Sequence, residues 1–385
     1  MVTAVQPLVL RRVPAVRHLG PNWYAAVMGT SAVGTGGAVL PGLTDGLRTG
    51  CTAVWALSLV LLVVVLTARA LHWTYHRDQA RTHLLDPAIA PFYGCLSMAL
   101  LAVGGGAVTV GRGWLGTPGA VALDAVLFTV GTAVGLVTAT AVPFLLTVRH
   151  RSELGQVTPA WLLPLVAPMV SAALGPLLLP YLPPGPPRET LLIGCFALFG
   201  LSLFMTLLML SLVFARLVLA GPLPLALTPT LFLVLGPLGQ STTAVGLFGD
   251  RAPGVVPAPY DRGLADFAVL YGIPVMGFAL LWLAFATAHV VRARRRGMRF
   301  AMTWWGFTFP VGTCVTGSAA LARHTGLAAY DWLTFGLYGL LVAVWAAAAV
   351  GTVRGLVSGE LLAAPRTAPA EPRPATARTT SDAVR

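Results

Sequence analysis

Ten long stretches without Asp, Glu, Lys or Arg limit what this chain can fold into more than any other feature. They are 18–44, 49–68, 87–111, 125–148, 154–187, 190–215, 217–249, 267–291, 300–322 and 332–353. A helix needs about 20 apolar residues to cross roughly 30 Å of hydrocarbon, so each stretch is long enough for one crossing. Because only 10% of the residues are charged, a soluble fold could not cover its surface. We therefore expect an all-α polytopic membrane protein with ten transmembrane helices.

The arginines predict which side the termini occupy. All 25 basic residues are Arg, and an even number of crossings places both termini on one side. Loops on that side carry 19 arginines and loops on the other side carry 6. Since cytoplasmic loops are enriched in basic residues, both termini are predicted to be cytoplasmic. The net charge of +12 then reflects topology, and we expect no nucleic-acid partner.

Composition divides the chain into three parts. Residues 1–19 are predicted to form a cytoplasmic N-terminal segment without a cleavable signal peptide, and 20–355 a ten-helix transmembrane domain. Residues 356–385, rich in Ala, Pro, Thr and Arg, are predicted to be a disordered cytoplasmic tail. The four cysteines lie in apolar stretches without a Cys-x-x-Cys pair, so we expect no metal site, no disulfide framework and no cofactor.

Glycine and proline are concentrated in the odd-numbered stretches. Proline removes a backbone donor, and in lipid the freed groups must face protein or water, so kinked helices belong inside. We predict kinks at Pro168, Pro237 and Pro310. The sequence thus favours five inner and five outer helices, paired as five helical hairpins around a central pore. The alternative is that these small residues only allow helices to pack closely.

The lumen of such a pore is predicted to be uncharged. Asp124, Asp266 and Arg323 are expected at helix ends, and cysteine is the only ionisable residue near the centre of a stretch. A neutral conduit selects by backbone dipoles, hydroxyl groups and constriction, and its kinked helices favour anions weakly. The candidate pore-lining or substrate-binding residues are Asn22, Thr30, Ser31, Gln240, Ser241, Thr242, Thr308 and Thr313. Gln240 would bind an anion or, equally well, a neighbouring helix.

Five segments in order resemble the tellurite-resistance and dicarboxylate transporter family, which includes TehA-like proteins, fungal malate and sulfite transporters and plant slow anion channels. They are Gly20–Thr30 with its Pro-Asn-Trp and Met-Gly-Thr, Phe92-Tyr93-Gly94, Thr158–Pro164, Gly236–Gln240 and Trp304–Pro310. Some relatives have His-Pro where this chain has Asp86-Pro87. The resemblance implies five hairpins around a pore, a homotrimer, and small anions as cargo.

In the channel branch of that family a phenylalanine on the ninth helix plugs the pore. The matching motif implies that this pore gate is Phe309, with Phe307 as the second choice. A hydrophobic constriction gates by excluding water, and a ring beside Pro310 could swing as the helix flexes. The alternative is that both rings pack between helices.

A possible metal site remains at the end of the second stretch. His72 and His76 are four residues apart, with His83 beyond, which is compatible with metal binding. Trp73 and Tyr75 favour an interfacial anchor instead.

The sequence therefore predicts a non-enzymatic protein of the inner (plasma) membrane that transports small anions. The cargo would be a C4-dicarboxylate such as malate, or a sulfite or tellurite-type oxyanion. The alternatives are a passive gated channel for chloride or nitrate rather than a proton-coupled carrier, and more distantly a membrane sensor or scaffold.

Overall fold

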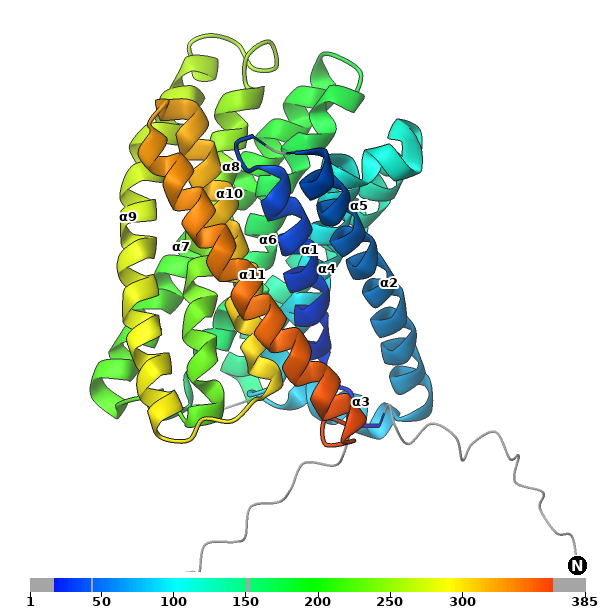
Figure 1. Ribbon diagram of the computed structural model, residues 1–385, viewed down its shortest axis with the longest axis vertical. Coiled ribbons are helices and arrows are strands. Elements are labelled where there is room, and N and C mark those ends of the chain that lie inside the picture. The colour runs from blue at the N-terminus through cyan, green and yellow to red at the C-terminus, as the bar shows by residue number, and fades with distance from the viewer. Residues whose placement is uncertain (1–16, 43, 150–152, 363–385) are drawn as a thin grey trace, which may run out of the picture.

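The computed structural model describes residues 17–42, 44–149 and 153–362, and they form helices joined by short connections (Figure 1). No strand occurs among these residues, so the all-α prediction is confirmed. In the same described part, seven helices are long and apolar enough to cross a membrane. A multi-pass membrane protein is thereby confirmed, whereas the count of ten crossings and the side of the termini stay predictions.

One set of long helices forms the outside of the molecule. It consists of α2 (Asp45–Tyr75), α5 (Arg112–Arg149), α7 (Pro186–Ala220), α9 (Tyr260–Arg295) and α11 (Ala328–Val357). In the most apolar windows of α2, α7, α9 and α11 only 22–28% of residues are buried. Side chains such as Phe204 and Leu270 are left exposed, which suits contact with lipid.

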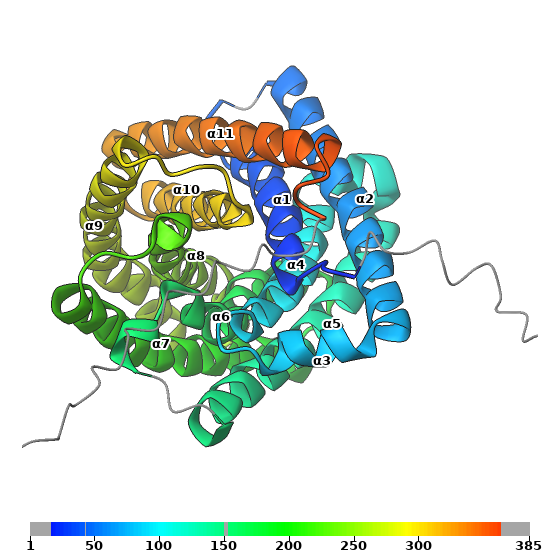
Figure 2. The same cartoon turned by 90° about the horizontal axis from the view of Figure 1, so that it is seen from below.

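A second set of shorter helices lies inside the first (Figure 2). Its members are α1 (Tyr24–Ala38), α4 (Gly94–Gly106), α6 (Leu163–Leu174), α8 (Leu235–Arg251) and α10 (Thr308–Thr325). Each packs against the outer helix that follows it in the chain: α1 on α2, α4 on α5, α6 on α7, α8 on α9 and α10 on α11. In the windows around α6 and α8, 89% and 94% of residues are buried. The inner helices are the glycine-rich stretches of the sequence.

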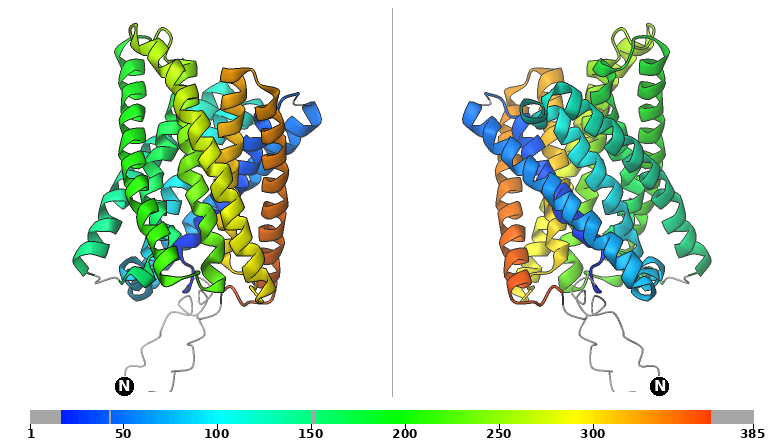
Figure 3. Two further views of the ribbon diagram at one scale, coloured as in Figure 1. Left: turned by 90° about the vertical axis from the view of Figure 1, so that its left-hand side faces the viewer. Right: turned by 90° about the vertical axis from the view of Figure 1, so that its right-hand side faces the viewer.

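Each inner helix is preceded by a short 3₁₀ turn. These turns are η3 (Pro21–Trp23), η4 (Ala90–Tyr93), η7 (Pro159–Leu162), η9 (Leu225–Val234) and η10 (Met302–Phe307). They lie toward the face that holds residues 17 and 362, at the bottom of Figure 1, which we call the terminal face. From the terminal face the inner helices run to the opposite face of the molecule, as the side views in Figure 3 show.

The predicted kinks take a different form from the one expected. Pro237 and Pro310 are each the third residue of their helices, directly after a 3₁₀ turn, where a missing N–H costs little. Pro168 does lie within α6, but the outer helices α5 and α9 also contain internal prolines, Pro143 and Pro274. Proline is therefore not confined to the inner set of helices.

The remaining connections shape the edges. The chain continues from α4 through η5 (Ala107–Gly111) into α5, turning at Gly116, whose φ is 70°. Asp124, expected at a helix end, lies eight residues after this turn and is buried beside Gly104. α3 (Arg77–Leu85) lies at the terminal face, η6 (Leu154–Gln156) precedes η7, and η8 (Gly175–Tyr181) extends α6.

Glycine allows α8 and α10 to approach each other closely. A Cβ atom on Gly239 would lie 2.5 Å from the backbone nitrogen of Cys314, and one on Gly317 would lie 2.9 Å from the carbonyl oxygen of Gly239. Both neighbours are backbone atoms that cannot move aside. The two helices therefore meet backbone to backbone, which brings their facing side chains into register.

We expect Gly317→Val to destabilise the protein by about 1–3 kcal/mol, because the added atoms would collide with the backbone of α8. Gly277→Val is the matched control, since a Cβ on this helical glycine of α9 meets nothing within 4 Å. Thermal unfolding in detergent would compare the two. Equal losses in both variants would contradict the close packing.

A second prediction concerns α3. Burial is the main cause that lowers the pKa of His83 to about 4, and His72, Arg69 and His18 lower it further while Asp86 opposes them. The His83 ring stacks on His72 with 5.3 Å between centroids. Since an unfolded histidine titrates near pH 6.5, this neutral contact stabilises α3 above that pH and is lost as the pH falls toward 4.

Hydrogen exchange of residues 77–85, corrected for intrinsic rates, should therefore accelerate between pH 7.5 and 5 in the wild type. His83→Gln cannot be protonated, so its exchange should change much less over the same range. An unchanged pH dependence in His83→Gln would assign the effect to another group.

Candidate functional site

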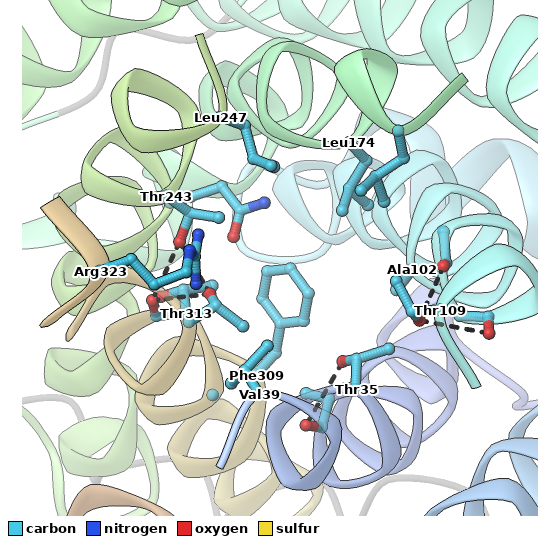
Figure 4. A pocket seen from close by; sticks show the side chains of 17 residues that line it. Thr35, Val39, Ala102, Thr109, Leu174, Thr243, Leu247, Phe309, Thr313 and Arg323 are labelled. Atoms are coloured by element: carbon cyan, nitrogen blue, oxygen red, sulfur yellow. Dashed lines mark hydrogen bonds between the residues drawn. The ribbon is translucent and has the colours of Figure 1, made fainter. Parts of the chain in front are cut away.

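A cavity of about 130 Å³ lies between the inner helices (Figure 4). Every inner helix contributes to its wall, with Thr35 from α1, Gly105 from α4, Leu174 from α6, Gln240 from α8 and Phe309 from α10. Most lining residues come from the later turns of these helices, which places the cavity in the half of the molecule away from the terminal face. A cavity needs about 10–15 Å³ to hold one water, so this one has room for several.

Phe309 lies between this cavity and a second, smaller space. Its ring lines both this cavity and a second space of about 10 Å³. Met28, Met98, Val166 and Leu233 surround that second space, from the earlier turns of the inner helices or the 3₁₀ turn before α8. A space of this size holds one water at most. Phe309 thus lies at a narrow apolar point on the axis of the bundle.

Phe307 lies elsewhere. Its ring packs edge-on against Phe232, with 4.8 Å between centroids, and against Trp304 at 5.8 Å. It lines neither of the two spaces. The two phenylalanines are two residues apart and both are 6% exposed, so they point in different directions with equal burial.

Several predicted pore-lining residues bond to another helix or to the backbone of their own helix and do not line the cavity. Thr30 accepts a hydrogen bond from Trp345 Nε1 at 3.1 Å, and Ser31 donates to the Ala102 carbonyl at 2.8 Å. Thr308 donates to Trp305 O, and both Ser241 and Thr242 donate to Leu238 O. Asn22 lies in η3 at the terminal face, half-buried. None of these six lines the cavity.

Gln240 and Thr313 do line the cavity, together with Thr243 and Thr316, which were not among the predicted residues. The hydroxyl oxygens of Thr243 and Thr316 are 2.7 Å apart, which joins α8 to α10. Each lies three residues beyond a predicted residue, and helical neighbours three apart share a face. This spacing was a signal in the sequence that could have identified both.

Arg323 corrects the prediction of an uncharged lumen. It lies in the last turn of α10, as expected of a helix end, whereas Phe309 lies in the first turn. The Arg323 side chain is one of those that line the cavity (Figure 4). Its Nη2 atom lies 3.2 Å from Asp250 Oδ2. The other carboxylate oxygen of Asp250 lies 3.1 Å from His324 Nε2. The walls near Phe309 are uncharged, and one cation stands at the far end.

No cluster of three or more metal-ligating side chains occurs in the described ranges. Cys51, Cys95, Cys195 and Cys314 are free and buried.

Two kinds of known protein are similar to this chain over most of its length. An uncharacterised transporter of Methanocaldococcus jannaschii is 26% identical over 351 residues, covering 90% of this chain and 96% of the relative. A sulfite efflux pump of Trichophyton rubrum is 27% identical over 329 residues, covering 83% of this chain and 86% of the relative. A sulfite efflux pump of Arthroderma otae shows the same identity over 346 residues.

The family described as voltage-dependent anion channel matches residues 18–353, which include all of the inner helices and the cavity between them. The resemblance to tellurite-resistance and dicarboxylate transporters is thereby confirmed, and the chain belongs to the voltage-dependent anion channel family.

Proposed function

We propose that this protein passes small anions across the membrane along the axis of the inner helices, and that Phe309 is the gate. The observation that carries the proposal is the position of Phe309 between two spaces on that axis. A narrow apolar point stops ions because water leaves it. Membership of an anion channel family supports an anion as the cargo.

The fold belongs to the same proposal. Inner helices packed on the outer helices that follow them support five hairpins, with ten crossings and a central pore. The distribution of arginine supports cytoplasmic termini and the inner (plasma) membrane as the location. A homotrimer with one pore in each subunit rests on the family resemblance.

Among the anions, we favour sulfite, because some of the relatives that match most of the chain are sulfite efflux pumps. A C4-dicarboxylate such as malate, and tellurite, are the other candidates that the family implies. Arg323 is the only ionisable side chain lining the two spaces in the described part of the chain. Proton-coupled carriers place Asp, Glu or His in the membrane path, and among the described residues none of these lines the two spaces. This lining favours passive flow of the anion over proton-coupled transport.

Voltage-driven flux tests the gate. In proteoliposomes without a pH gradient, Phe309→Ala should raise the rate of sulfite, malate or chloride flux by roughly tenfold, which corresponds to a barrier lowered by about 1.4 kcal/mol. Phe307→Ala is the matched control, because it removes the same atoms at equal burial outside the two spaces. Flux that needs a pH gradient, or that rises equally in both variants, would sink the gate assignment.

Cysteine labelling tests the side to which the cavity opens. Thr316→Cys should react with a membrane-impermeant thiol reagent added to intact cells, because Thr316 lines the cavity away from the terminal face. Thr308→Cys should stay unreactive, since Thr308 is fully buried and lines neither space. The four native cysteines are buried, so their background is low. Reaction of Thr316→Cys only in inverted vesicles would reverse the proposed orientation.

A further inference from the structure

The threonine hydroxyls on the cavity wall have already used their hydrogens. Thr35 donates to Ser31 O at 3.1 Å, Thr313 to Pro310 O at 2.7 Å and Thr316 to Thr313 O at 3.0 Å. A hydroxyl has one hydrogen to donate, so these groups present lone pairs to the cavity. An anion needs donors and must find them elsewhere.

Two donors on the wall remain. The Gln240 side chain is 4% exposed, lines the cavity, and has no hydrogen-bond partner within the described residues. Its amide nitrogen carries two N–H hydrogens that can be donated to a bound group. The Arg323 side chain is 48% exposed and has five N–H hydrogens, of which the contact with Asp250 uses one on Nη2.

Asp250 holds the guanidinium without covering it. This residue lies in the last turn of α8, opposite Arg323 and His324 in the last turn of α10. One carboxylate oxygen faces Arg323 at 3.2 Å, and the other faces His324 Nε2 at 3.1 Å. His324 Nε2 also lies 3.0 Å from the Gly246 carbonyl. Asp250 thus lies within contact distance of two side chains of α10.

We propose that Arg323 and Gln240 form a binding site for a small oxyanion in the cavity, and that Asp250 competes with this oxyanion for Arg323. The inference rests on the proposed function and adds a recognition site to it. A free guanidinium would hold an anion tightly, whereas conduction requires that the ion can leave. The tethered carboxylate weakens the hold, because an arriving anion must share or replace one of its contacts.

The chemistry of the donors selects the class of anion. The planar fork of Arg matches two oxygens of a carboxylate or sulfite, and a chloride ion cannot use both branches in this way. Gln240 adds N–H donors on a neighbouring helix. The site should therefore prefer oxyanions to halides, although both can pass a neutral constriction.

Binding can be measured apart from flux. In purified protein, sulfite should raise the thermal midpoint in a concentration-dependent way, because a ligand of the folded state stabilises it. We expect Arg323→Gln to weaken the apparent affinity for sulfite by roughly fivefold or more, and Asp250→Asn to strengthen it by a similar factor. Arg323→Lys should retain chloride binding but lose much of the preference for sulfite.

Two further variants are controls, one for the loss of any arginine and one for the loss of the whole ion pair. Arg262→Gln removes an exposed arginine of α9 that does not line the cavity, so its sulfite affinity should equal that of the wild type. The double variant Arg323→Gln/Asp250→Asn removes both charges of the pair; weak sulfite binding in it, with a thermal midpoint without ligand equal to that of the wild type, would assign the loss to the site.

The two failures are distinguishable. If all variants bind sulfite as the wild type does, or if Arg262→Gln behaves as Arg323→Gln does, the site is wrong even where voltage drives anion flux. If sulfite binding follows Arg323 and Asp250 but no anion crosses proteoliposomes, the site stands and the proposed transport function is wrong.

Discussion

Backbone hydrogen bonding without water is the constraint on which the rest of this structure depends. In hydrocarbon each N–H and C=O must find a partner within the protein, which limits crossing segments to helices or closed barrels. The described chain meets this constraint with helices alone. Within the described residues a 3₁₀ turn precedes each inner helix, and the outer helix α5 contains its own turn at Gly116.

Close packing of the inner helices then determines where the functional side chains lie. α8 and α10 meet through Gly239 and Gly317, and the same contact joins Thr243 to Thr316. Phe309 follows from that register, because it lies one helical turn before Thr313 on the cavity face of α10. A shift of either helix would move the ring relative to both spaces, so the glycines hold the constriction in place.

The two ends of the cavity have different chemistry, and each complements the other. Phe309 presents an apolar ring, whereas Arg323 offers a charge that is paired with Asp250. A constriction alone does not distinguish one small anion from another. A cation alone would retain the anion. Separated along one axis, the two residues can combine a barrier with recognition, which is how our two proposals fit together.

The sequence by itself determined the class of fold. Uncharged stretches of about 20 residues leave few alternatives to membrane helices, because burying charge in lipid is costly. It also indicated the inner set, since glycine and proline follow the need for close packing and covered backbone. Short motifs were enough to identify the family and to single out Phe309 and Gln240.

Only the tertiary structure decided which polar side chains reach the cavity. Thr30, Ser31, Ser241 and Thr308 have the same composition signal as Thr313, but their hydroxyls face backbone or neighbouring helices. From the sequence, Arg323 was predicted only to lie at a helix end. In the structure it lines the cavity and contacts Asp250. A sequence shows how residues are spaced along one helix, but the direction of each face depends on the packing of all its neighbours.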